Sequence, residues 1–161
     1  VALSNEDGEV LLAGPLHHSG MATILTSDEL ERDRDHSEVV KACDTASTIR
    51  QLVKDRKFGV KIDIEGAEPM VLPGLIEQSA LKFVVFEGVQ SEQWLWDFFT
   101  ENGFKIFGLE RSILVSQIAP LKSFEDWMRF HDFVAIRTEQ EFQNKKISLA
   151  KMRQILDKDD W

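Results

Sequence analysis

The stretch Val60-Lys-Ile-Asp-Ile-Glu-Gly-Ala-Glu68 is the part of the sequence from which the expected fold follows. Side chains alternate along a strand, so the apolar residues at 60, 62 and 64 would face one way and Lys61, Asp63 and Glu65 the other. Central parallel strands are normally apolar on both faces, and buried carboxylates are costly unless they are paired. An acidic face that ends in Gly66 therefore indicates an exposed edge or a site at the carboxyl end of the strand, where open α/β sheets bind ligands.

The next apolar run repeats this arrangement, because Leu81–Phe86 leads into Glu87 and Gly88. A turn and a helix are expected between the two runs, over 66–79. Strand–helix–strand units are almost always right-handed and join parallel neighbours. We therefore expect Gly59–Ile64 and Leu81–Phe86 to be adjacent parallel strands, with the helix between them on one face of the sheet.

The remaining elements extend the alternation of strands and helices that is typical of a sheet covered by helices. Asp44 is expected to cap a helix that runs through Lys54, and a second helix would begin near Ser91 and stop at Gly103. Further short strands are expected on either side of the turn Asn5–Gly8 and at Met21–Leu25, Glu38–Ala42, Phe104–Leu109 and Phe133–Ile136. The last two would pair antiparallel at the end of the sheet.

Two segments near the end of the chain are expected to have particular roles. Residues 112–129 hold Pro120 and Trp127 and are predicted to lie over the cleft as a lid. Thr138 and Glu141 form a capping box that predicts a helix over 137–161. Its apolar stripe would pack on the chain's own sheet, the alternative being a partner protein.

Length and composition limit the classes of function. With 161 residues and 43% hydrophobic residues, the chain is expected to form one domain over 1–161. A net charge of −9 without a basic cluster argues against nucleic-acid binding. No apolar run approaches the roughly 20 residues that span a bilayer. The single cysteine, Cys43, fits a reducing compartment, so a cytoplasmic location is the default expectation.

The central motif and its flanks resemble one known family. The segment Lys61-Ile-Asp-Ile-Glu-Gly-Ala-Glu68 with Val71-Leu72 and Gly74 is similar to the signature of the FkbM methyltransferases. The resemblance covers about residues 1–137 and is strongest over 59–88. Three flanking features agree with it in order: the turn Ser4–Gly8, which resembles the family's hairpin, the helix-opening Asp44, and the strand Phe83–Glu87.

The resemblance implies a class I, Rossmann-like methyltransferase fold with a seven-stranded sheet and an antiparallel closing hairpin. It also implies S-adenosylmethionine as cofactor and O-methylation of a hydroxyl on a small molecule, lipid or sugar. Two features depart from the family. Pro69 and Pro73 fall in the helix after the motif. No two of the nine glycines are separated by a single residue, so the cofactor-binding GxG loop is absent.

We therefore expect this chain to be the C-terminal part of a methyltransferase domain, with roughly 90 residues of strand–helix units missing upstream. The cofactor-binding half would lie in that missing segment, and the chain alone would be inactive. A methyltransferase-like scaffold or interaction module without catalytic activity is the alternative.

The resemblance and the strand pattern together assign roles to individual residues. Asp63 and Glu65 are the candidates to polarise or deprotonate the acceptor hydroxyl, with Glu87 as a third. Asp63, Gly66 and Glu68 are the candidates to contact the cofactor. We expect the carboxylates to converge at the sheet's carboxyl end. No metal is assigned, although a divalent ion held by these acids is one alternative and an ion pair with Lys61 is another.

Overall fold

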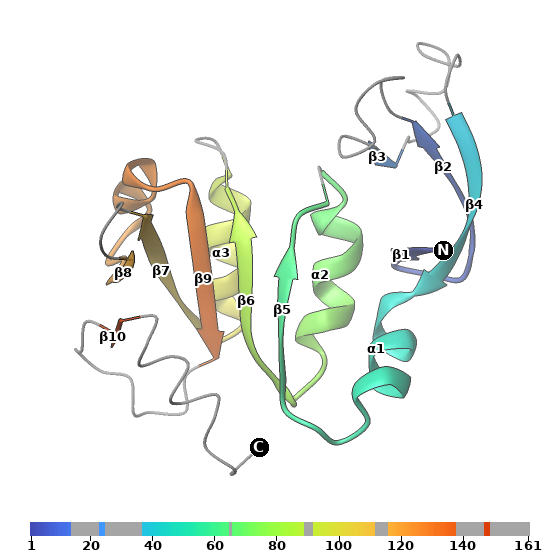
Figure 1. Cartoon of the computed structure of the whole chain (residues 1–161), viewed down its shortest axis with the longest axis horizontal. Coiled ribbons are helices and arrows are strands. Elements are labelled where there is room, and N and C mark those ends of the chain that lie inside the picture. The colour runs from blue at the N-terminus through green and yellow to red at the C-terminus, as the bar shows by residue number, and fades with distance from the viewer. Residues whose placement is uncertain are drawn as a thin grey trace. The chain divides into compact units, whose positions relative to one another are not determined.

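The computed structural model describes residues 1–13, 23–24, 37–64, 66–88, 92–111, 116–137 and 147–148. The chain has an α/β fold with two mixed sheets, whose elements are labelled in Figure 1. It divides into two compact units. The first unit consists of Val1–Asp55 and Asp63–Ser79, and the second of Arg56–Ile62 and Ala80–Trp161.

The first unit contains a four-stranded sheet in the order β1-β4-β2-β3. Its strands are β1 (Ala2–Ser4), β2 (Gly8–Ala13), β3 (Thr23–Ile24) and β4 (Ser37–Asp44). The expected strands on either side of the turn Asn5–Gly8 are confirmed. They do not form a hairpin with each other, because β4 lies between them, parallel to β1 and antiparallel to β2.

Two helices complete the first unit, α1 (Thr45–Val53) and α2 (Glu68–Ile76). The predicted cap of α1 is confirmed, since the Ser47 amide donates to the Asp44 carboxylate at 2.7 Å. Helix α2 packs on α1 through Gly74, whose missing side chain leaves room for the Ala46 backbone nitrogen and the Thr45 side chain. The Gln78 amide group holds the same contact by donating to the Ala46 carbonyl at 3.3 Å.

Replacing Gly74 by alanine is expected to destabilise the protein, although alanine is the better helix former by about 1 kcal/mol. An added Cβ would lie 2.8 Å from the Ala46 backbone nitrogen and 2.9 Å from the Thr45 Cβ. Pushing α1 and α2 apart should cost about 1–3 kcal/mol in urea unfolding. Gly8→Ala is the matched control, because its added Cβ would have no atom within 4 Å among the residues that the structure describes. Equal stability of the two variants would contradict this packing.

The Asp44 cap predicts a pH dependence of stability. The Ser47 amide hydrogen bond holds the pKa of Asp44 below its ordinary value. A pKa lowered by folding stabilises the protein above the ordinary aspartate pKa, and this stabilisation is lost as the pH falls through the lowered value. The Tm difference between wild type and Asp44→Asn should therefore be constant near neutral pH and shrink on acidification. A difference that does not change down to the acid limit would show that the charge contributes nothing.

The second unit contains a six-stranded sheet in the order β10-β8-β7-β9-β6-β5. Its strands are β5 (Phe58–Ile62), β6 (Leu81–Glu87), β7 (Phe104–Arg111), β8 (Ser116–Pro120), β9 (Asp132–Arg137) and β10 (Ile147–Ser148). The predicted parallel pairing of β5 with β6 is confirmed. The predicted antiparallel pairing of β7 with β9 is also confirmed, and β9 is inserted between β6 and β7. The predicted position of this pair at the end of the sheet is wrong, because β8 pairs with β7 and β10 with β8.

An aromatic core packs on one face of this sheet. Phe86 of β6 stacks on Phe99 of α3 (Gln93–Glu101) with 4.8 Å between ring centroids. Trp127 of the 3₁₀ helix η2 (Phe124–Arg129) stacks on Phe133 of β9 at 4.0 Å and is 1% exposed. The opposite face carries a second apolar cluster, formed by Phe107, Ile118, Val134 and Ile136.

Two predictions about the end of the chain are wrong. Residues 116–120 form β8 and Trp127 is part of the core, so these parts of the segment 112–129 do not form a lid. Residues 112–115 lie outside the described ranges. Ile147 and Ser148 pair with Ile118 and Gln117 of β8, which excludes them from the helix expected over 137–161. The rest of that helix, from 138 onwards, lies outside the described ranges.

Candidate functional site

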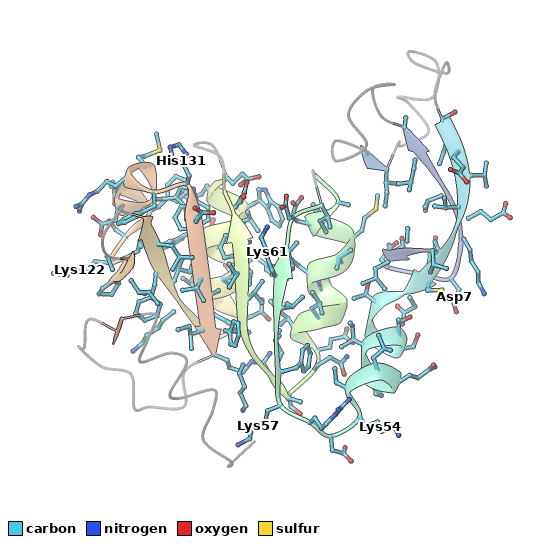
Figure 2. All side chains as sticks on the ribbon, in the orientation of Figure 1. Asp7, Lys54, Lys57, Lys61, Lys122 and His131 are labelled. Carbon is cyan, nitrogen blue, oxygen red and sulfur yellow. The ribbon has the colours of Figure 1, made fainter. Side chains whose placement is uncertain are left out.

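The carboxyl end of β5 lies level with that of β6 in the second unit. Ile62, the last residue of β5, is paired with Phe86, and both side chains are buried. Lys61 is exposed and lies on β5 beside Val85 (Figure 2). The register therefore confirms that two parallel strands end at the same edge, as the strand–helix–strand pattern predicted.

Asp63 follows β5 instead of belonging to it, and this corrects the predicted strand. Because β5 ends at Ile62, the alternation of faces does not continue to Asp63. Asp63 is exposed. The chain turns at this point, and the Ala67 amide donates to the Ile64 carbonyl at 3.1 Å. Glu65 lies outside the described residues.

The turn ends at Glu68, which is the first residue of α2 and is half-buried. Pro69 occupies the first turn of this helix, where its missing N–H is harmless. Pro73 lies inside the helix without ending it, since α2 continues to Ile76.

The two glycines that follow the strands are required for different reasons. Gly66 has φ +93°, a conformation that other residues rarely adopt, and no atom of the described residues lies within 4 Å of an added Cβ. A Cβ on Gly88 would lie 2.6 Å from the Trp127 ring and 2.9 Å from the Phe133 ring. Gly66 thus allows a turn and Gly88 allows aromatic packing, so the repeated acid–glycine pattern is not in itself evidence of one site.

Glu87 has an acidic neighbour that the sequence did not reveal. It is exposed at the end of β6, and the register pairs it with Asp132, the first residue of β9. The adjacent Gly88 amide donates to the His131 carbonyl at 3.0 Å, and His131 is exposed at this edge (Figure 2). The residues His131 and Asp132 directly precede a predicted strand, and this is the signal that would have identified them.

The predicted site residues are divided between the two units. Asp63, Gly66 and Glu68 belong to the first unit and Glu87 to the second. Their convergence around one cleft stays a prediction, as does an ion pair of Lys61 with Asp63 or Glu87.

Two further findings bear on metal binding and on membrane insertion. Within the described ranges, no three His, Cys, Asp or Glu side chains form a group that could hold a metal ion. No helix in the described part of the chain is long and apolar enough to cross a membrane.

Comparisons of the chain with models of protein families, with curated proteins and with solved structures each gave no match. The likeness to the FkbM methyltransferases therefore rests on the motif from Lys61 to Glu68 and its flanks.

Proposed function

We propose that the chain is the acceptor-side part of an S-adenosylmethionine-dependent methyltransferase that methylates a hydroxyl on a small molecule, lipid or sugar. The observation that carries the proposal is the connection between β5 and α2. A strand with a parallel neighbour runs into Asp63, turns at a glycine of positive φ and enters a helix at Glu68. This is the position at which open α/β sheets bind their ligands.

The closing part of the sheet also supports the proposal. Strand β9 is antiparallel to both of its neighbours, while β6 and β7 run in the same direction. An antiparallel closing strand is what the class I methyltransferase fold implies.

The chemistry assigned to the chain itself is modest. A bound cofactor would supply an activated methyl group on a sulfonium, and alignment of the acceptor accounts for most of the rate. Asp63 would accept the proton of the acceptor hydroxyl as the new O–C bond forms and the S–C bond of the sulfonium breaks, leaving a neutral thioether. Its exposed carboxylate and the open space beside Gly66 fit one side of such a cleft. Glu68, at the positive end of α2, is the remaining candidate contact for the cofactor.

The residues present fit only part of the cofactor, so the 161-residue chain should bind it very weakly or not at all. The GxG loop and the ribose-binding acid of this fold are expected in residues outside the chain. Calorimetry with the isolated chain should show no saturable heat at micromolar cofactor. Micromolar binding would contradict the assignment of the cofactor half to a missing segment.

A non-catalytic, methyltransferase-like scaffold is the second candidate. The observation that favours it is that Gly66 and Gly88 both have structural causes, a turn and an aromatic contact. A scaffold would retain the sheet without needing exposed Asp63. The parent protein's sequence before Val1 would distinguish the two candidate functions. A GxG loop after a strand there would support the enzyme, and the absence of such a loop would support the scaffold.

A further inference from the structure

The first unit contains a cleft of about 540 Å³. Pockets that hold small organic ligands are typically about 300–1,000 Å³. All the described residues that line it belong to the first unit. The cleft is therefore large enough for a ligand or for the apolar part of one.

The walls of the cleft are mainly apolar. Val10 and Ala42 come from the neighbouring strands β2 and β4, and Met70 comes from α2. The register places Gly8 opposite Ala42 and Val10 opposite Val40, so Gly8, Val10 and Ala42 lie on one face of the sheet. Because Gly8 has no side chain, it leaves more open space at its end of the cleft. An unbranched hydrocarbon would bury apolar surface against these walls.

One end of the cleft is acidic. The turn from β1 to β2 brings Glu6 and Asp7 to the rim, and Glu9 follows at the start of β2. Within the described part of the chain, no lysine, arginine or histidine lines the cleft. Glu9 is paired in register with Lys41, which offsets its charge. Glu6 and Asp7 thus give the rim a negative charge.

Asp7 also has a structural role that limits its use in experiments. One of its carboxylate oxygens accepts the backbone N–H of Asp44 at 2.9 Å, which ties the turn to the start of α1. The Thr45 hydroxyl likewise donates to the Ser4 carbonyl at 2.7 Å. These bonds hold the acidic turn in place at the mouth of the cleft, and they leave Glu6 as the acid whose charge can be removed without breaking them.

We propose that this cleft binds an organic cation with an apolar tail, the tail lying against Val10 and Met70 and the positive group at Glu6 and Asp7. Charge complementarity selects this occupant, since an anion would meet only like charge at the rim. Met70 lies two residues after Glu68, in the same unit as Asp63. Resting on the proposed function, the cation is the methyl acceptor, so the acceptor class is an amino-bearing amphiphilic alcohol.

The test compares three eight-carbon probes that differ only in charge: octylammonium, octan-1-ol and octanoate. Binding to the 161-residue chain is measured by calorimetry at low salt, without cofactor. Octylammonium should bind about 3- to 10-fold more tightly than octan-1-ol, as expected for an exposed ion pair, and octanoate should bind most weakly. Equal affinities of the three probes, or tightest binding of octanoate, would overturn the proposal.

Two variants locate the binding. Glu6→Gln should weaken octylammonium binding about 2- to 5-fold and leave octan-1-ol unchanged, because only one charge at the rim is removed. Glu77→Gln is the matched control, since Glu77 is an exposed acid of the same unit that does not line the cleft. An equal loss in both variants would show a general effect of net charge and would overturn the site.

Val10→Trp should fill the cleft and weaken all three probes, with circular dichroism to check that the variant is folded. Unchanged binding in a folded variant would overturn the site. If the variant is unfolded, the comparison of Glu6→Gln with Glu77→Gln decides.

The outcomes also separate this inference from the proposed function. Octylammonium selectivity without methyl transfer by the intact protein would refute only the enzyme, whereas methyl transfer without such selectivity would refute only the cation site.

Discussion

Replacing Trp127 by alanine is expected to lower the free energy of unfolding by about 3–5 kcal/mol, a typical loss for a buried tryptophan. Trp127 is 1% exposed and stacks on Phe133 at 4.0 Å. Its ring also lies 5.8 Å from that of Phe86 and occupies the space above Gly88. The truncation would leave a cavity between η2 and the sheet, and urea unfolding would measure its cost.

Met128→Ala is the matched control, because Met128 is the next residue of η2 and is 49% exposed. Its loss should be within about 1 kcal/mol. If Trp127→Ala and Met128→Ala had equally small effects, η2 would not be part of the core, and the lid expected from the sequence would be restored.

Replacing Asp63 by asparagine in the intact protein is expected to lower methyl transfer by about 100-fold or more, as for the loss of a general base. The side chain is exposed and follows the last residue of β5, so the fold should not depend on its charge. The melting temperature should therefore remain close to that of the wild type. Initial rates at saturating cofactor, together with thermal unfolding, measure the two effects separately.

Asp55→Asn is the control for this change, because Asp55 is also an exposed aspartate of the first unit but precedes β5. It should leave both activity and stability unchanged. A large loss of stability in Asp63→Asn with little loss of activity would instead identify Asp63 as a member of a structural ion-pair network.

The sequence predicted those parts of the fold that have a strong local pattern. The mostly apolar run Leu81–Phe86 and the alternating stretch Gly59–Ile64 before it were sufficient to predict two parallel strands, because strand–helix–strand units join parallel neighbours. Asp44 predicted the start of α1, because an N-cap aspartate accepts a hydrogen bond from the backbone amide three residues later, so the signal is local in the sequence. Gly103, with φ +79°, follows the end of α3 as expected.

The errors arise where contacts distant in sequence decide the outcome. Strand β8 was missed because Ser116–Pro120 is short, contains one large apolar residue and ends in proline, and it becomes a strand only by pairing with β7. The end of β5 at Ile62 could not be predicted, because the alternation of apolar and charged residues continues in the sequence to Glu65. The neighbour of Glu87, Asp132, depends on a register across 45 positions that no local pattern specifies.

The candidate site was therefore only partly accessible from the sequence. The motif located the turn between β5 and α2, since Gly66 has the positive φ that favours glycine. The reason for Gly88 was hidden, because it depends on the ring of Trp127, which comes from η2. The acidic cleft beside Met70 was hidden as well, because its walls come from β2, β4 and α2.

Methyl transfer by the intact protein is the measurement that tests the central claim most directly. The protein is incubated with S-adenosylmethionine carrying an isotopically labelled methyl group and with hydroxyl-bearing small molecules, lipids and sugars, and products are identified by mass spectrometry. The proposed function predicts label on an acceptor oxygen and an equal amount of S-adenosylhomocysteine, both lost in Asp63→Asn. An intact protein that neither binds nor consumes the cofactor would contradict it.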